Sequence, residues 1–392
     1  MSVLSGLDVL VANEFVPIRD RRVGVVCNQA SITRDLQHIT DVFLRAHQQG
    51  LIRLEAWFGP QHGIWGHTQD NMIEWPGYVD ERTGIPTHSL YGEHRKPTAA
   101  MLEGLETLVV DLQDVGARYY TFVWTAALCL EACGERGIEV VVLDRPNPIS
   151  GHRVEGCLLQ ESYRSFVGLH PVPVRHGMTV GEIARYLHGR FYPQCKLTVI
   201  QLQGWERRMY FEDTQLPWVM PSPNMPLVET AVVYPGLCLL EATNLSEGRG
   251  TTRPFEIFGA PWVDGWRFAE TLNKTDLPGV YFRPIEFQPT FHKYAGQKCE
   301  GSFIHVIDRQ TFEPFLTGIA IIREAIRCYP DHFQWRKPPY EYEYEKMPFD
   351  ILVGNGWLRG ALEAQHSLES LRDRWQEELK SFLPIREEVL MY

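Results

Sequence analysis

The sequence predicts an α/β fold in which a doubly wound, mostly parallel sheet is followed by a second, smaller α+β domain. In the first half, short apolar runs alternate with amphipathic segments, as in βαβ units. The run from Val140 to Val142 is apolar throughout, as expected of a central strand covered on both faces. After about residue 204 the alternation stops, and 392 residues suffice for more than one domain.

Five short runs of the first half are predicted to be strands of the sheet, at 23–27, 53–58, 107–112, 139–143 and 196–202. Helices are predicted between them over 39–49, 119–136 and 179–191, where apolar side chains recur with helical spacing. Short strands separated by helices are typical of parallel sheets, because parallel neighbours need a crossover connection.

The second half is predicted to be less regular. Residues 217–226 carry four prolines and are excluded from regular structure. We expect a short helix over 234–243, strands over 280–287 and 302–307, and a helix over 312–328. A loop or edge strand is expected over 338–346, and then a last helix with an apolar face from Leu368 to Phe382 that Pro384 ends. The predicted boundary lies near residue 255, which gives domains 1–255 and 256–392.

Composition narrows the classes of function. The chain carries 38 Lys and Arg against 49 Asp and Glu, a net charge of −11, with no basic run. Such a chain is a poor partner for nucleic acid or an anionic membrane, so neither is expected. We find no signal-peptide pattern and no run of about 18 apolar residues. With eight dispersed cysteines, the expectation is a cytoplasmic protein with reduced thiols.

The ligand site is expected beyond the carboxyl ends of the strands, where doubly wound sheets bind their ligands. The segments after the second, third and fourth predicted strands, at 59–66, 113–118 and 144–148, all combine polar side chains with Gly or Pro. The glycine fingerprints of dinucleotide and phosphate loops are absent, as are the HExxH and GxSxG motifs. Neither a nucleotide cofactor nor a metal is therefore expected.

Carboxylates beside arginines are the chemical signal at this edge. Asp114 follows the third strand, with Arg118 one turn later. Glu247 lies between serine and glycine, with Arg249 and Arg253 just after it. Each group also has a plain structural interpretation, Asp114 as a helix cap paired with arginine and Glu247 as the anchor of a turn.

Arg175 and His176 form a third polar corner just before a predicted helix, and helix entry alone would explain them. Paired carboxylates, arginines and scattered tryptophans suit glycoside chemistry on an acidic sugar. A glycosidase usually needs a protonated acid for the leaving oxygen and a second group for the anomeric carbon. An arginine fork binds a carboxylate through two hydrogen bonds. The residues alone predict an enzyme acting on a small polar substrate, with a sugar as one candidate.

At these same loops the sequence resembles the exo-β-N-acetylmuramidases, a family long catalogued as a domain of unknown function. The resemblance runs from Gly6 nearly to Tyr392. The stretches that carry it are FGPQHGIWG (58–66), LYGEHRKPTAAML (90–102), VVDLQDVGARYYTF (109–122), VVLDRPNPISG (141–151), RSFVGLHPVPVRHGMTVGEIA (164–184), MYFEDTQLPWVMPSPNMP (209–226), YPGLCLLEATNLSEGRGTTRPFEIFGAPW (234–262) and FRPIEFQPTFHKYAGQKCEG (282–301).

The resemblance implies hydrolysis of β-linked N-acetylmuramic acid from the non-reducing end of peptidoglycan fragments. It also implies a Rossmann-like domain that bears the active site, a smaller domain that closes one side of the cleft, and no nucleotide or metal. For a cytoplasmic member, the implied partner is a small carbohydrate, a muropeptide-derived disaccharide or glycan end, and the implied role is cell-wall recycling.

The resemblance and the polar loops together predict the site residues. Glu247 is expected to be the ionised or proton-transferring carboxylate, and Arg249 or Arg118 to bind the lactyl carboxylate of muramic acid. The predicted catalytic residues are Glu247, Gln61, His62 and Asp114, and the predicted substrate-binding residues are Glu74, Arg118, Asn147, Arg175, His176, Asn224, Asn244, Arg249 and Arg253.

One departure from the family pattern bears on the chemistry. The loop after the second strand usually reads P-E-H-G, an apolar residue and R-G, whereas this chain has Gln61 for the glutamate and Trp65 for the arginine. An amide neither gives nor takes a proton at neutral pH. Another carboxylate such as Glu74 or Glu247 could take the role, or the 2-acetamido group of the substrate could act as nucleophile. The alternatives are a catalytically impaired sugar-binding homologue and a glycosidase of shifted specificity.

Overall fold

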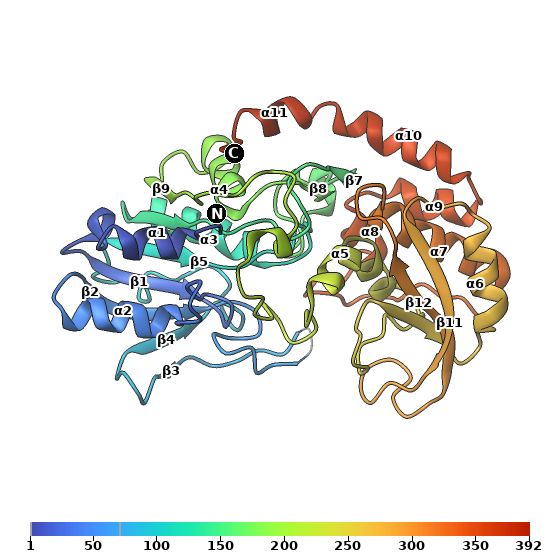
Figure 1. Cartoon of the computed structure of the whole chain (residues 1–392), viewed down its shortest axis with the longest axis horizontal. Coiled ribbons are helices and arrows are strands. Elements are labelled where there is room, and N and C mark those ends of the chain that lie inside the picture. The colour runs from blue at the N-terminus through green and yellow to red at the C-terminus, as the bar shows by residue number, and fades with distance from the viewer. Residues whose placement is uncertain (1, 70–71) are drawn as a thin grey trace.

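The computed structural model describes residues 2–69 and 72–392 and contains two domains side by side (Figure 1). The first domain, blue to green, is built on a seven-stranded sheet, and the second, yellow to orange, on a three-stranded sheet. The last helices, in red, run back from the second domain over the first. The predicted fold class is confirmed.

The large sheet has the strand order β3-β4-β2-β1-β5-β6-β9, and its neighbours pair in parallel except for β3 and β4 at one edge. All five strands predicted for it are present. The strands are β1 (Arg22–Cys27), β2 (Arg53–Gly59), β3 (Tyr78–Val79), β4 (Pro86–Ser89), β5 (Thr107–Asp111), β6 (Glu139–Leu143) and β9 (Leu197–Ile200).

Helices cover both faces of this sheet. Side chains of α1 (Gly6–Ala12) and α2 (Ile39–Gln48) share one hydrophobic cluster with Val109 and Val141 of the strands. Those of α3 (Phe122–Gly134) and α4 (Val180–Arg190) share the other cluster with Val110 and Val142. Because alternate side chains are buried on opposite faces, β5 and β6 are apolar along nearly their whole length.

Asp144 joins β6 to the start of α4 and to the end of the chain. Its Oδ1 accepts a hydrogen bond from Gly181 N at 2.7 Å. Its Oδ2 accepts from the hydroxyls of Thr179 and Tyr392, at 2.8 and 2.7 Å. Burial raises the pKa of Asp144 to about 7, although these hydrogen bonds act in the opposite direction.

The raised pKa makes the stability of the fold depend on pH. Between about pH 4 and 7, folded Asp144 binds a proton that the unfolded chain has released, so its stabilising contribution is full below that range and is lost as the pH rises through it. At about 1.4 kcal/mol for each pKa unit, the loss is about 4 kcal/mol. Urea unfolding from pH 4 to 8 should show stability falling, and Asp144→Asn should flatten the curve. An unchanged curve in Asp144→Asn would contradict this assignment.

The second domain holds an antiparallel sheet of strand order β10-β12-β11, packed against helices. The predicted strands and the helix over 312–328 are present. Its elements are α5 (Val228–Leu237), the 3-10 helix η4 (Cys238–Ala242), β10 (Ile257–Ala260), α6 (Gly265–Asn273), β11 (Val280–Phe287), β12 (Cys299–Val306), α7 (Pro314–Cys328), α8 (Pro348–Val353) and α9 (Trp357–Glu363).

The C-terminal helices α10 (Leu368–Leu379) and α11 (Leu383–Glu387) return to the first domain. The prediction that Pro384 ends the last helix is wrong, because Pro384 lies in the first turn of α11, where a missing N–H costs no hydrogen bond. Arg386 of α11 donates to the carbonyl oxygens of Gly151 and Gly177, at 2.6 and 2.9 Å.

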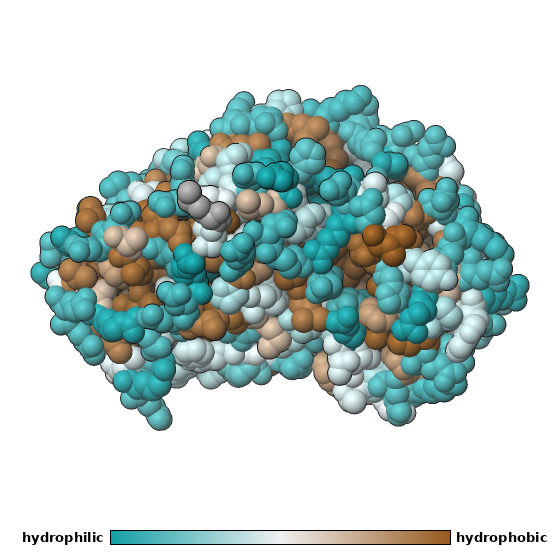
Figure 2. All heavy atoms as spheres, in the orientation of Figure 1, coloured by the Kyte–Doolittle hydropathy of each residue, from teal (hydrophilic) through white to brown (hydrophobic). Residues whose placement is uncertain are grey.

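The remaining elements connect these layers. They are β7 (Glu155–Leu158), β8 (Pro173–Arg175), and the 3-10 helices η1 (Val16–Ile18), η2 (Glu161–Tyr163) and η3 (Phe211–Thr214). Residues 338–346 contain no strand and form a loop with a tight turn. Hydrophilic side chains cover most of the face in Figure 2. Within the described ranges, no helix is both long and apolar enough to cross a bilayer.

Candidate active site

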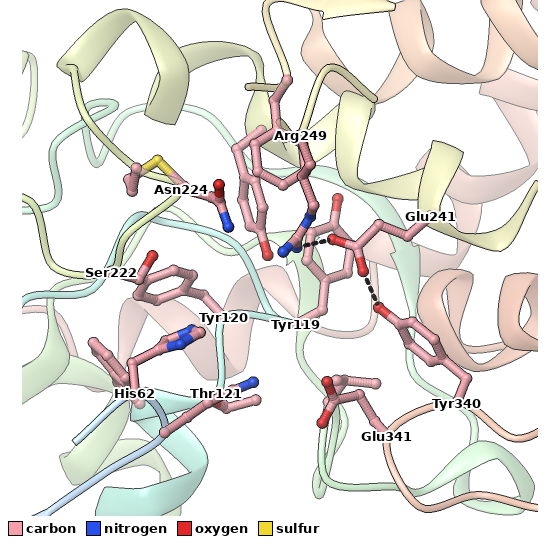
Figure 3. Close-up of a pocket in the computed structure, with 16 residues that line it drawn as sticks. His62, Tyr119, Tyr120, Thr121, Ser222, Asn224, Glu241, Arg249, Tyr340 and Glu341 are labelled. Carbon is pink, nitrogen blue, oxygen red and sulfur yellow. Dashed lines mark hydrogen bonds and ion pairs between the residues drawn. The ribbon is translucent and has the colours of Figure 1, made fainter. Parts of the chain in front are cut away.

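A polar pocket lies where the loop after β2 and the start of α3 meet η4 and two loops of the second half (Figure 3). Its position at the carboxyl edge of β2 and β5 is the one expected of a doubly wound sheet. The lining residues are Gln61, His62, Tyr119, Tyr120, Thr121, Phe122, Val167, Ser222, Asn224, Met225, Tyr234, Glu241, Arg249, Phe255, Tyr340 and Glu341.

Arg249 is the arginine of this lining, and carboxylates hold it. Its terminal nitrogen contacts Glu241 at 2.5 Å, and its Nε lies 3.4 Å from Glu247. The second oxygen of Glu241 accepts a hydrogen bond from the Tyr340 hydroxyl at 2.8 Å. Figure 3 shows the Glu241 carboxylate between Arg249 and Tyr340. The carboxylates of Glu241 and Glu247 therefore fix the guanidinium in the wall of the pocket and balance its charge.

Glu247 is fully buried outside the lining, next to Arg249. Its oxygens also contact Lys293 at 2.8 Å and His292 at 3.1 Å. Burial would raise the pKa of Glu247, but Lys293, His292 and Arg249 outweigh that effect and hold the pKa well below its usual range. Glu247 is therefore an ionised counter-charge for Arg249, and the structure does not place it where it could transfer a proton to a ligand in the pocket.

Gln61 and His62 line the pocket as the sequence analysis predicts for them. The amide oxygen of Gln61 accepts from the Thr121 hydroxyl at 2.7 Å, and its amide nitrogen donates to the Tyr91 hydroxyl at 3.2 Å. The His62 Nδ1 lies 2.7 Å from the Thr68 carbonyl oxygen. His62 has a φ of 72°, a left-handed conformation that is uncommon outside glycine.

Asn224 is the other predicted residue that lines the pocket, together with Arg249. Its amide nitrogen donates to the Gln69 carbonyl oxygen at 2.9 Å, and its amide oxygen accepts from the Gln69 side chain at 3.3 Å. Figure 3 shows Asn224 above Ser222, across the pocket from Glu341. The loop 217–226 thus supplies one wall of the pocket, although its prolines exclude it from regular structure.

Asp114, Asn147 and His176 form a separate buried cluster outside the pocket lining. His176 Nε2 donates to Asp114 at 3.1 Å, and Gly116 N donates to the same oxygen at 2.6 Å. Asn147 donates to the Met178 carbonyl oxygen at 2.9 Å. These hydrogen bonds fasten the loops after β5 and β6 to the segment 176–178 just before α4. The structural interpretation of Asp114 as a helix cap paired with arginine is wrong, because Thr121 is the N-cap of α3 and Asp114 bonds to His176 and Gly116 instead.

Arg118 is fully buried and lies outside the pocket. Its guanidinium donates to the carbonyl oxygens of Cys157, Val172 and Leu352 at 2.6–2.9 Å, and burial lowers its pKa to about 10. Because its donors are directed at backbone, Arg249 and not Arg118 is the arginine able to meet a substrate carboxylate in this pocket.

The remaining predicted residues also lie outside the lining. Arg175 is buried and donates to the Ile149 carbonyl oxygen at 2.5 Å. Asn244 is bonded to the backbone of the loop at 332–334. Arg253 lies 3.4 Å from Glu256, and Glu74 is exposed. Asn244 and Arg253 lie within the family motif at 234–262, but their side chains contact residues of the second domain and not the pocket.

The two carboxylates of the lining, Glu241 and Glu341, are not among the residues predicted from the sequence. Glu241 lies in η4 at the end of an apolar helical segment, and its buried polar environment has no local sequence signature. Glu341 lies in the segment 338–346, where tyrosine and glutamate alternate after two prolines. Within residues 2–69 and 72–392, no group of three or more His, Cys, Asp or Glu side chains is arranged to hold a metal ion.

Two models of one protein family match this chain. The family model described as exo-beta-N-acetylmuramidase NamZ, N-terminal, matches residues 23–229, and the corresponding C-terminal model matches residues 232–392. The chain belongs to the exo-β-N-acetylmuramidase NamZ family. The resemblance drawn from the sequence motifs is confirmed. The two family models meet between residues 229 and 232, and the boundary near residue 255 stays a prediction.

Individual relatives extend over the full chain. Peptidoglycan beta-N-acetylmuramidase NamZ of Bacillus subtilis (strain 168) is 42% identical over 390 residues, which cover 100% of this chain and 91% of the relative. Two crystal structures of DUF1343 family proteins from Bacteroides fragilis NCTC 9343 are also similar. One has a TM-score of 0.89 at 31% identity and the other 0.76 at 26%, each covering 100% of this chain and 99% of the other.

Proposed function

We propose that this protein is an exo-β-N-acetylmuramidase, which hydrolyses terminal β-linked N-acetylmuramic acid from the non-reducing end of peptidoglycan fragments. Family membership over the whole chain and the 42% identity to a peptidoglycan beta-N-acetylmuramidase support the proposal. The pocket carries the groups that such a reaction needs, which are carboxyl groups, hydroxyls and one arginine fork.

The observation that carries the proposal is Arg249 in a pocket lined by carboxyl groups and tyrosines. N-acetylmuramic acid differs from N-acetylglucosamine by a lactyl ether, whose carboxylate is the one anionic group of the sugar. A guanidinium fixed by Glu241 and Glu247 is preorganised to bind that carboxylate through its planar fork. Asn224 and Ser222, on the opposite wall, offer polar groups to the acetamido and hydroxyl substituents.

The proposal extends to the cellular setting. We place the protein in the cytoplasm, where it would act in cell-wall recycling on muropeptide-derived disaccharides or short glycan ends. The eight cysteines are free thiols and seven of them are buried, which fits a reducing compartment. Fractionation of the source cells should recover the protein with cytoplasmic markers, and recovery with the exported fraction would contradict this placement.

The test of the activity is release of free N-acetylmuramic acid from a chromogenic β-N-acetylmuraminide, with the matching N-acetylglucosaminide run alongside. Turnover of the muraminide alone supports the proposal. Turnover of the glucosaminide alone would instead establish a glycosidase of shifted specificity. Binding of the muraminide without turnover would establish a sugar-binding protein that keeps the pocket without its chemistry.

The sugar-binding alternative rests on Gln61, which stands where the family pattern has a glutamate. If the missing acid were what limits this protein, Gln61→Glu would create activity or raise it strongly. Both ends of the Gln61 amide are hydrogen-bonded in the wall of the pocket, the oxygen to Thr121 and the nitrogen to Tyr91. A glutamate here would lose the donor that faces Tyr91.

A further inference from the structure

We infer that Glu341 is the proton-transferring carboxyl group of this pocket and takes the role that the family pattern assigns to a glutamate at position 61. The inference rests on the proposed function. Glu341 lines the pocket although it lies 280 residues from Gln61 in the chain. Figure 3 shows its carboxyl group between Thr121 on one side and Tyr340 on the other, facing the interior of the pocket.

Tyr91 connects Glu341 to the position of the missing glutamate. The Tyr91 hydroxyl donates to Glu341 Oε2 at 2.8 Å and accepts from the Gln61 amide at 3.2 Å and from Met72 N at 3.2 Å. A tyrosine hydroxyl has one proton to donate, and here that proton goes to Glu341. Because Gln61 donates to this hydroxyl, Glu341 is the one carboxyl group that Tyr91 binds, and it lies next to position 61 on the other side of the Tyr91 hydroxyl.

The environment of Glu341 suits a group that gives and takes a proton near neutral pH. Only 3% of the residue is exposed, and burial raises its pKa to about 7. Glu241 acts in the same direction, whereas the Tyr91 hydrogen bond and the charges of Arg95 and Arg249 lower the pKa. The other titratable groups of the lining are His62, Tyr119, Tyr120, Tyr234, Glu241, Arg249 and Tyr340. A catalytic acid is most effective when its pKa is close to the working pH.

The two carboxyl groups of the lining have different surroundings. Glu241 is bound by Arg249 at 2.5 Å and accepts a hydrogen bond from the Tyr340 hydroxyl at 2.8 Å. Glu341 receives one tyrosine hydrogen bond and is otherwise desolvated. Glycosidases use two carboxyl groups in unlike surroundings for acid and charge-stabilising roles.

The backbone at Glu341 is itself unusual. Glu341 and Tyr342 have φ values of 45° and 65°, and they form the centre of a two-residue turn in which Tyr340 and Glu343 exchange backbone hydrogen bonds of 2.9 Å. Such turns strongly favour Asn-Gly, because both central residues must be left-handed. Arg95 lies 3.7 Å over the Tyr342 ring and holds the turn. Strained residues of this kind persist mainly at functional sites, and this one carries Glu341 into the pocket.

The step assigned to Glu341 is proton transfer in both halves of the hydrolysis. The protonated carboxyl group gives its proton to the glycosidic oxygen while the bond from C1 to that oxygen breaks, and the bonding electron pair leaves with the oxygen. A water oxygen then forms a bond to C1, and the proton that it releases goes to the Glu341 carboxylate. One water is consumed, the aglycone leaves as an alcohol, and the carboxyl group is restored.

Glu341→Gln tests this role, because glutamine keeps the shape and can still accept from Tyr91. We expect kcat on a β-N-acetylmuraminide with an alkyl or sugar leaving group to fall by about 10²–10⁴-fold. The fall should be much smaller with a 4-nitrophenyl leaving group, which needs little protonation. In the wild type, kcat should change with pH near pH 7, and this pH dependence should disappear in Glu341→Gln. Glu343→Gln, in the same turn but outside the lining, is the matched control and should keep both kcat and the pH profile.

Different results would overturn the inference and the proposed function separately. Equal losses with both leaving groups, or an unchanged pH limb in Glu341→Gln, would show that Glu341 is not the proton donor while wild-type turnover upholds the function. A gain of turnover in Gln61→Glu would likewise overturn it. Glu341→Asp, which keeps a carboxyl group, should retain more activity than Glu341→Gln with the alkyl leaving group. An inert wild-type protein would remove both the function and the inference.

Discussion

Arg249→Lys should lower kcat/KM for a β-N-acetylmuraminide by about 30- to 1,000-fold. The lysine keeps the positive charge beside Glu241 and Glu247 but loses the planar fork that meets a carboxylate with two hydrogen bonds. Replacing the two hydrogen bonds of a desolvated charged pair by a single point contact is expected to cost about 2–4 kcal/mol, which corresponds to this range. Steady-state kinetics on the chromogenic muraminide measures the effect.

The matched comparison is a substrate whose lactyl carboxylate is converted to its amide. The wild-type enzyme should turn over the acid much better than the amide, whereas Arg249→Lys, which keeps the charge but loses the fork, should show a much smaller preference for the acid. Thermal unfolding of the variant serves as the control for folding, and it should stay close to the wild type. A variant that still discriminates fully between acid and amide would remove Arg249 as the carboxylate-binding residue.

Glu247→Gln should destabilise the protein by about 3–5 kcal/mol, because it leaves buried cations without their counter-charge. Glu247 is completely buried against Lys293, His292 and Arg249. Since its pKa is held below the usual range, its contribution is present at neutral pH and is lost as the pH falls toward that low folded pKa. Urea unfolding at pH 7 measures the loss directly.

Glu286→Gln is the control for the loss of a paired glutamate. Glu286 lies 2.8 Å from Lys298, but both side chains are about half exposed or more, so water replaces the lost charge. We expect no measurable change in its unfolding curve. If Glu247→Gln were equally well tolerated, Lys293 and Arg249 would not depend on Glu247 as their counter-charge, and the fixed position of Arg249 would need another explanation.

The parallel sheet could be predicted from the sequence because its signal is local. The strands β1, β2, β5, β6 and β9 are buried under helices, and each therefore has apolar residues that can be recognised within its own short stretch of sequence. The edge that carries the site follows from the same pattern, since loops after parallel strands share one edge. Gln61 and His62 could be placed there without knowing any long-range contact.

The role of Arg118 could not be predicted in the same way. Its three carbonyl partners lie up to 234 residues away in the chain. Nothing near Arg118 in sequence shows whether its guanidinium binds backbone carbonyls or a ligand. Glu341 was missed for the opposite reason. Its segment looks like a solvated loop, and only the turn held by Arg95 directs its carboxyl group inward.

The return of the C-terminal segment to the first domain has a consequence for the order in which the protein can fold. Tyr392 donates to Asp144, accepts from Leu202 N and packs on Trp205, so residues synthesised after the whole second domain complete the first. Domains usually fold as they leave the ribosome, the N-terminal one first. Here the first domain lacks these contacts of Tyr392 until the second domain has been synthesised as well.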